Sequence, residues 1–332
     1  MNVARWARRQ RNLLEAQVKL MPHDAGRWHA LAQAELTLGN LRRGFELFEA
    51  RLQDTDIAGT SWVPAGPRWL GQPVDAGFDG TLYVQPEQGL GDQIMMARYL
   101  PLCKERWAQV VCEVRPPLYR LFHENFGDMV IPLRAESISY DFAVPVLSLP
   151  MVFHATIPKA PYLTSRFRKD APFWTSAHGK VIGIAWAGAA RHRNDQARSI
   201  PEAVLIPLLA SDFGPWVSLQ VDRPPMPRMV DLRAYIQDVA DTARFVAGLS
   251  LVITCDSMVA HLAGALGVPC WVLLPYVPDW RWQLDRSDSP WYPSVRLFRQ
   301  KRPGDWADVI TRVLHALERR DTAPVSVGIT ER

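Results

Sequence analysis

The chain has 332 residues, of which 48% are hydrophobic and 22% charged, and its formal net charge is +4. This composition is typical of a globular protein of two or three domains, and it excludes a disordered or fibrous chain. The positive charge is mild, and no basic motif interleaved with aromatic residues accompanies it. We therefore expect no nucleic-acid binding.

Cysteines and apolar stretches indicate the compartment. The four cysteines form no Cys-x-x-Cys pair, which predicts buried free thiols in a reducing compartment and no zinc site. The basic start of the chain lacks the continuous apolar core of a secretion signal. The longest apolar stretch, residues 268–277, contains prolines and is too short to span a bilayer. We expect a cytoplasmic protein without a transmembrane segment; membrane association through a partner stays open.

Residues 1–57 are predicted to be helical. The spacing of one tetratricopeptide unit is matched by Trp28, Leu31, Ala32, Leu36, Gly39, Gly44, Phe45 and Phe48. Glu35 and Arg51 depart from that consensus, which usually has an aromatic residue and alanine there. One such unit cannot bury its own face, so we expect it to pack on the neighbouring domain. The alternative is that this segment is a docking platform for an acceptor substrate.

A connector rich in proline and glycine follows at residues 57–80. Just before it, Asp54-Thr55-Asp56 matches the Asp-x-Asp metal motif of some glycosyltransferases. The motif follows a helix in a linker rather than a strand in a sheet, so we expect no metal site there.

Residues 81–165 alternate between strands and helices, which predicts a doubly wound half. Expected strands are 81–85, 109–114, 129–132 and 140–144, and expected helices are 94–106 and 118–125. After the first strand, Gly89 and Gly91 form a loop that lets backbone approach a ligand, and Asp92 and Gln93 open the helix. The dinucleotide fingerprint is absent, because position 94 is isoleucine. Asp92 could equally cap the helix after a flexible turn.

A second doubly wound half begins near residue 180, after a boundary at 163–178. Expected strands are 180–186, 216–220, 251–254 and 270–274, and expected helices are 202–209, 239–248 and 306–319. Residues 320–332 are expected to be disordered.

The turn after strand 251–254 carries the strongest site signal. Asp256, Ser257 and Met258 stand where a helix begins, with His261 one turn further on. Free N–H groups and the helix dipole suit a phosphate there, at the carboxyl end of a parallel strand. The competing interpretation is an ordinary cap with a histidine satisfied inside the protein.

Two further loops follow strands. Arg191, Arg193 and Arg198 come after strand 180–186 and can bind phosphate oxygens in bidentate fashion, or form a solvated basic loop. After strand 270–274, Trp280 could stack on a base or sugar, with Asp279 or Arg281 fixing polar groups. Alternatively, the tryptophans there anchor the loop in a core. Asp238 is expected to cap a helix.

Several of these motifs resemble the heptosyltransferase-type glycosyltransferases of family 9. They are Gln88-Gly-Leu-Gly-Asp-Gln93, Ala97-Arg-Tyr-Leu-Pro-Leu102, Trp186-Ala-Gly188 and the segment from Asp256 to Gly267. Segments 279–282, 289–293 and 296–300 resemble a bacterial group that adds an N-terminal tetratricopeptide segment. The likeness covers residues 25–318 in patches. The family typically has a lysine after strand 180–186, whereas this chain has none between Lys180 and Lys301.

The resemblance implies a GT-B fold, with two Rossmann-like doubly wound domains behind the helical segment. The expected division is 1–57 helical, 58–165 acceptor side, 166–300 nucleotide-sugar side, 301–319 a helix crossing back to the first domain, and 320–332 a tail. Asp238 would approach the ribose in this arrangement.

The implied activity is an inverting, metal-independent transfer of a hexose or heptose from a nucleotide-diphosphate sugar to a hydroxyl of a glycan or protein. No cofactor beyond the donor is expected. Asp92 would be the general base. The donor would be held by Gly89, Gly91, Gln93, Arg191, Arg193, Arg198, Asp256, Ser257, Met258, His261, Asp279 and Trp280. A non-catalytic GT-B module that binds a sugar or partner, and a nucleotide-sugar epimerase, are the alternatives.

Overall fold

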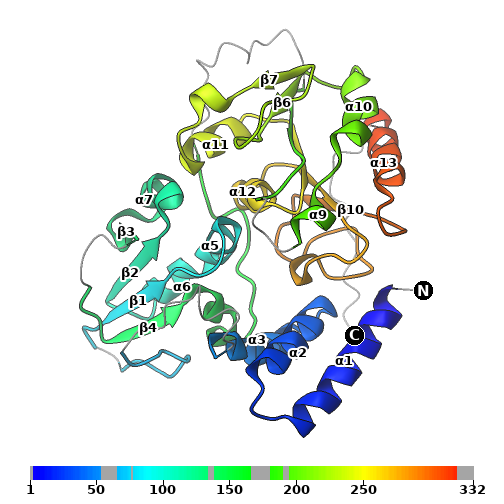
Figure 1. Ribbon diagram of the computed structural model, residues 1–332. Helices are drawn as coiled ribbons and strands as arrows, with labels where there is room; N and C mark the ends of the chain where they lie inside the picture. The colour runs from blue at the N-terminus through cyan, green and yellow to red at the C-terminus, as the bar shows by residue number, and fades with distance from the viewer. Residues whose placement is uncertain are drawn as a thin grey trace. The chain divides into compact units, whose positions relative to one another are not determined.

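The computed structural model describes residues 3–53, 66–75, 78–133, 138–165, 180–189 and 194–319 (Figure 1). The chain divides into two compact units, Met1–Pro158 with Asp279–Asp285, and Lys159–Pro278 with Arg286–Arg332. Each unit is built on a parallel sheet, so the predicted α/β class is confirmed. Among the described residues, no helix is long and apolar enough to cross a membrane.

Three helices open the first unit: α1 (Val3–Leu20), α2 (Ala25–Thr37) and α3 (Leu41–Phe48). Asp24 caps α2 by accepting a hydrogen bond from the backbone N–H of Arg27 at 3.1 Å. The 3-10 turn η1 (Glu49–Leu52) continues α3. The helical prediction is confirmed for the described part of this segment, and its assignment as a tetratricopeptide unit stays a prediction.

The first sheet has the order β3-β2-β1-β4. Its strands are β1 (Thr81–Gln85), β2 (Gln109–Val114), β3 (Val130–Pro132) and β4 (Phe142–Pro145). Its helices are α5 (Leu90–Met96), α6 (Leu100–Lys104), α7 (Tyr119–Phe126) and α8 (Leu149–Val152). One continuous helix over 94–106 was expected. A 3-10 turn, Ala97–Tyr99, instead separates α5 from α6, because Pro101 is accommodated only in the first turn of a helix.

The second sheet has the order β10-β9-β8-β5-β6-β7. Its strands are β5 (Ile182–Ala185), β6 (Trp216–Ser218), β7 (Met229–Asp231), β8 (Leu251–Cys255), β9 (Cys270–Leu274) and β10 (Val295–Arg299). The sequence prediction missed the two edge strands. β7 is three residues long and has no buried residue, and β10 carries arginines at 296 and 299, so neither has the continuous apolar run of a central strand.

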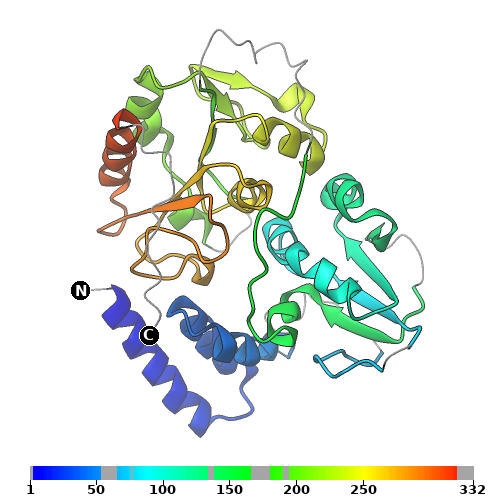
Figure 2. The same cartoon turned by 180° about the vertical axis from the view of Figure 1, so that it is seen from behind.

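Helices cover both faces of the second sheet. They are α9 (Asp195–Arg198), α10 (Glu202–Ala210), α11 (Val239–Val246), α12 (Met258–Leu266) and α13 (Trp306–Glu318). Alternate strand residues share one apolar core with α10 and α13, and α12 contacts β8 and β9 on the other face. We expected the last helix to cross to the first domain. Instead α13 lies beside α10 in both views (Figures 1 and 2), and Val309 and Val313 are buried in this core.

A close approach on α12 gives a first prediction. A Cβ at Gly264 would lie 2.3 Å from Cγ of Tyr292, so the tyrosine ring fills the space that only glycine leaves. We expect Gly264→Ala to lower the free energy of unfolding by about 1–3 kcal/mol, as overpacking does, in urea titrations. The loss should shrink when Tyr292→Leu is added. An equal loss in both backgrounds would contradict this explanation.

Candidate functional site

Each sheet has one place where the order of its strands reverses. In the first sheet the chain builds from β1 through β2 to β3, and β4 joins the other side of β1. In the second sheet the corresponding place lies between β5 and β8, where Ala185 at the end of β5 is in register with Thr254. Ligands of open parallel sheets bind outside the carboxyl ends of the strands at such switch points. The glycine loop after β1 and the turn after β8 both lie there.

The glycine loop, residues 86–92, is anchored by a buried ion pair. Arg51 of η1 is fully buried, and its Nη2 and Nε lie 2.7 Å and 3.0 Å from the two carboxylate oxygens of Glu87. Glu87 also accepts a hydrogen bond from the backbone N–H of Leu147, beyond the end of β4. The helical segment is therefore built into the first unit at its switch point. The sequence analysis missed Glu87 and treated Arg51 only as a departure from consensus.

Other groups complete the surroundings of Arg51. Its Nη1 lies 2.9 Å from Oε1 of Glu49, and Nη2 donates to the Ser148 hydroxyl at 2.9 Å. Burial alone would lower the pKa of Arg51, but the carboxylates of Glu87 and Glu49 raise it. The guanidinium thus remains charged inside the protein.

Both carboxylate oxygens of Asp92 have partners in the first unit. Oδ2 accepts from the backbone N–H of Gly89 at 2.8 Å, and Oδ1 is ion-paired with Nη2 of Arg281. Nη1 of Arg281 lies 2.7 Å from Oδ1 of Asp279. The structure therefore brings two predicted residues, Asp92 and Asp279, to one guanidinium, and a third, Gly89, to the other oxygen of Asp92. Sequence reasoning noted Arg281 beside Trp280 but did not pair it with Asp92.

Trp280 packs against the helical segment. It is 5% exposed, and its ring centroid lies 5.7 Å from that of Phe45 and 5.9 Å from that of Phe48, both on α3. The guanidinium of Arg281 lies 4.2 Å from the ring centroid. These contacts favour the interpretation of Trp280 as an anchor for its loop rather than as a platform for a base.

The remaining predicted residues of the loop lie in the first turn of α5. Gly91 is half-buried there. Gln93 is buried, and its Oε1 accepts from the backbone N–H of Arg115 at 3.2 Å, just beyond the end of β2. This hydrogen bond ties α5 to the neighbouring strand end.

In the second unit, Arg198 lies against Gly188 at the carboxyl end of β5. A Cβ at Gly188 would be 2.3 Å from Nη2 of Arg198, so the guanidinium occupies the space that glycine leaves. Asp195 accepts from Nε of Arg198 at 3.3 Å and from the Ser199 hydroxyl at 3.1 Å. The hydroxyl in turn accepts from the N–H of Gly188 at 3.2 Å. The predicted Arg191 and Arg193 lie outside the described residues.

The turn after β8 begins helix α12. Ser257 is the N-cap residue of α12, Asp256 precedes it, and Met258 is the first helical residue. Within the described part of the chain, the Ser257 side chain accepts no capping hydrogen bond; its Oγ lies 3.0 Å from Oγ1 of Thr254. The Ser257 hydroxyl is therefore not a partner of the first N–H groups of α12.

His261 is satisfied inside the protein and Asp238 caps a helix, as the sequence analysis allowed. His261 is buried, and its Nδ1 lies 3.0 Å from the Tyr292 hydroxyl. Asp238 caps α11 by accepting from the N–H groups of Ala240 at 2.8 Å and Asp241 at 3.1 Å. A role for either residue at a ligand stays a prediction.

The described residues contain no group of three or more His, Cys, Asp or Glu side chains that could hold a metal ion. Asp54 and Asp56 of the Asp-x-Asp motif lie outside the described residues. The cysteines are free and buried, as expected, and burial raises the pKa of Cys112 and of Cys255 to about 12.

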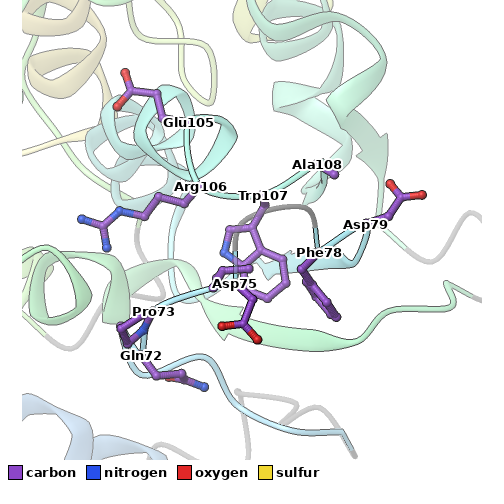
Figure 3. A pocket seen from close by; sticks show the side chains of 11 residues that line it. Gln72, Pro73, Asp75, Phe78, Asp79, Glu105, Arg106, Trp107 and Ala108 are labelled. Atoms are coloured by element: carbon purple, nitrogen blue, oxygen red, sulfur yellow. The ribbon is translucent and has the colours of Figure 1, made fainter.

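A hollow of about 870 Å³ lies at the opposite edge of the first sheet (Figure 3). Its walls come from residues 71–75, 78–79 and 105–108, which precede β1 and β2. The indole ring of Trp107 lies there between the side chains of Arg106 and Phe78. None of the predicted site residues lines it.

Comparison with known proteins finds distant likenesses. No family model matches the chain. The protein FlbA of Caulobacter vibrioides is 25% identical over 347 aligned positions, which cover 87% of this chain and 54% of FlbA. The chain thus spans about half the length of this curated relative.

Three solved structures are similar to parts of the chain. ADP-heptose lipopolysaccharide heptosyltransferase II of E. coli is 13% identical, with a TM-score of 0.48, over 73% of this chain and 100% of that one. A family 9 glycosyltransferase from Veillonella parvula is 13% identical, with a TM-score of 0.45, over 73% and 93%. The iron-containing dodecameric glycosyltransferase TibC of enterotoxigenic E. coli is 13% identical, with a TM-score of 0.48, over 70% and 66%. Likenesses this remote assign no function.

Proposed function

We propose that this chain is a cytoplasmic GT-B glycosyltransferase that moves a sugar from a nucleotide-diphosphate donor to a hydroxyl of a glycan or protein, with inversion and without metal. One observation carries the proposal. The two loops that resemble family 9 glycosyltransferases stand at the switch points of two separate parallel sheets, where ligands of such sheets bind.

The second unit would hold the donor. The first N–H groups of α12 and the guanidinium of Arg198 beside Gly188 supply positive charge at the ends of β8 and β5. These groups would stabilise the negative charge that grows on the diphosphate as it leaves, which lowers the barrier rather than merely improving binding.

The first unit would hold the acceptor. Asp92 would accept the proton of the acceptor hydroxyl as its oxygen bonds to the anomeric carbon and the bond to the diphosphate breaks on the opposite side. The hydrogen bond from Gly89 fixes one oxygen of Asp92, and Arg281 stabilises the carboxylate charge. Transfer requires the acceptor to reach Oδ1 beside the guanidinium.

A non-catalytic binding module is the second candidate. The observation that favours it is the double engagement of Asp92, whose two oxygens both have partners. The donor site in the second unit would then serve recognition alone. Incubation with the donor sugar of any nucleotide that binds separates the candidates, because an enzyme transfers or slowly hydrolyses the sugar and a module leaves it intact.

Calorimetric titration with a panel of nucleoside diphosphates tests the donor site. We expect binding of at least one of them in the presence of a chelator, because helix N–H groups and arginine supply the charge that a metal would otherwise supply. Binding that strictly requires magnesium or manganese would contradict the metal-free proposal. Absence of binding to every nucleotide would contradict the function itself.

Gly188→Ala tests, in the same titration, whether the guanidinium of Arg198 binds the diphosphate. The added Cβ would displace the guanidinium of Arg198. We expect nucleoside-diphosphate affinity to fall by about 10-fold to 100-fold, since a charged hydrogen bond contributes about 1.5–3 kcal/mol. Arg198→Gln should cause a similar loss, and the double variant should add little more. Additive losses would show that Gly188 and Arg198 act separately.

A further inference from the structure

Helix α1 exposes an apolar stripe on the side that faces away from α2. Trp6, Leu13 and Leu20 are 36%, 48% and 82% exposed, and they are spaced seven residues apart. An α-helix drifts by about 20° per seven residues, so the three side chains lie within roughly 40° of one another around the helix. Met21, 51% exposed, extends the stripe at its end.

The charges of α1 are divided between its two sides. Its one acidic residue, Glu15, is ion-paired with Arg11 of the same helix and with Arg43 of α3, on the side that packs in the unit. Arg8, Arg9 and Lys19 are exposed. With five cations and one acid, α1 carries a formal charge of +4, which equals that of the whole chain. The positive charge of this protein is thus concentrated on α1, where Arg9, four residues before Leu13, lies next to the stripe and Arg8 and Lys19 lie further around the helix.

The pattern of the stripe excludes a coiled-coil partner. Knobs-into-holes packing needs a second apolar position three or four residues after the first in each heptad. Those positions hold Arg9, Gln10 and Gln17, with only Ala16 apolar. A second copy of the helix is also disfavoured, because two surfaces of charge +4 repel each other. Binding to a flat anionic surface needs no such second position, because only the outermost side chains of the stripe have to enter the surface.

We propose that α1 binds the surface of an anionic lipid bilayer. Trp6, Leu13 and Leu20 enter the boundary between headgroups and acyl chains, where tryptophan is favoured. Arg8, Arg9 and Lys19 reach the lipid phosphates, helped by their long flexible stems. Because α1 is already folded against α2, no folding entropy opposes binding. The proposal holds whether or not the chain is a glycosyltransferase.

Co-sedimentation with lipid vesicles tests the proposal. We expect binding to phosphatidylcholine vesicles that contain phosphatidylglycerol, no binding to pure phosphatidylcholine, and weaker binding as salt rises. Arg8→Gln with Arg9→Gln should weaken binding about fivefold for each cation removed. Leu13→Ser, which leaves the charge unchanged, should weaken it about tenfold or more, since an apolar side chain no longer enters the boundary.

Matched variants elsewhere on the chain serve as controls. Ile206→Ser removes an apolar side chain on α10 that is 58% exposed, and Arg302→Gln with Arg319→Gln removes two exposed cations. These variants should bind vesicles as the wild type does, and all variants should melt at the same temperature. Equal losses in the controls, or no binding to the anionic vesicles, would overturn the proposal. So would dimerisation that Leu13→Ser abolishes, which would assign this side of α1 to a second copy.

Discussion

Replacing Arg51 with methionine is expected to lower the free energy of unfolding by about 3–5 kcal/mol, the loss typical of breaking a buried ion pair. Glu87 is 1% exposed, and the variant would leave its carboxylate with the N–H of Leu147 but without its cation. Ser148 and Glu49 would lose a donor at the same time. Urea or guanidinium unfolding measures the change.

The double variant Arg51→Met with Glu87→Leu is the control. Removing both charges together leaves no uncompensated carboxylate, so the pair should recover much of the stability that Arg51→Met loses. An Arg51→Met loss below about 1 kcal/mol would show that water reaches Glu87, because exposed ion pairs contribute little. The ion pair would then hold the glycine loop to η1 only weakly.

The central strands of both sheets could be predicted from the sequence because their residues are buried on both faces. Residues 81–85, 109–114 and 270–274 are strands with the predicted bounds, each an apolar run that ends at polar or proline residues. The edge strands β7 and β10 of the second sheet lack that signal, because β7 has no buried residue and β10 carries two arginines. The sequence also predicts one helix where the structure has α5 and α6, because apolar residues continue across Pro101.

The candidate site was only partly predictable, because its paired residues lie far apart in the sequence. The loops at the carboxyl ends of strands can be found locally, from glycines and polar residues after an apolar run. The side-chain partners of these loops cannot be found locally, because Arg51 and Glu87 are 36 residues apart in the chain and Asp92 and Arg281 are 189 apart. Only the fold brings such pairs together. The one available signal was Arg51 itself, a charged residue at a position that usually packs an alanine.

Asp92→Asn is expected to reduce sugar transfer by about 10²-fold to 10⁴-fold, the range typical of losing a general base. Asparagine keeps the shape of the side chain, and its amide oxygen can accept the hydrogen bond from the N–H of Gly89, the N-cap residue of α5, as Asp92 does. Arg281 keeps its contact with Asp279. Donor affinity should therefore be nearly unchanged while turnover falls. Steady-state kinetics with any donor that binds, together with calorimetry, separates the two quantities.

The comparison with Asp92→Ala decides what Asp92 does. If it is the base, both variants should be similarly inactive, and alanine alone should lose about 0.5–1.5 kcal/mol of stability with the hydrogen bond from Gly89. If asparagine preserves activity while alanine loses both activity and stability, Asp92 is a structural residue that holds Gly89 and Arg281 in place. A wild-type protein that binds a donor but neither transfers nor hydrolyses it would instead be a binding module, with Asp92 committed to its two partners.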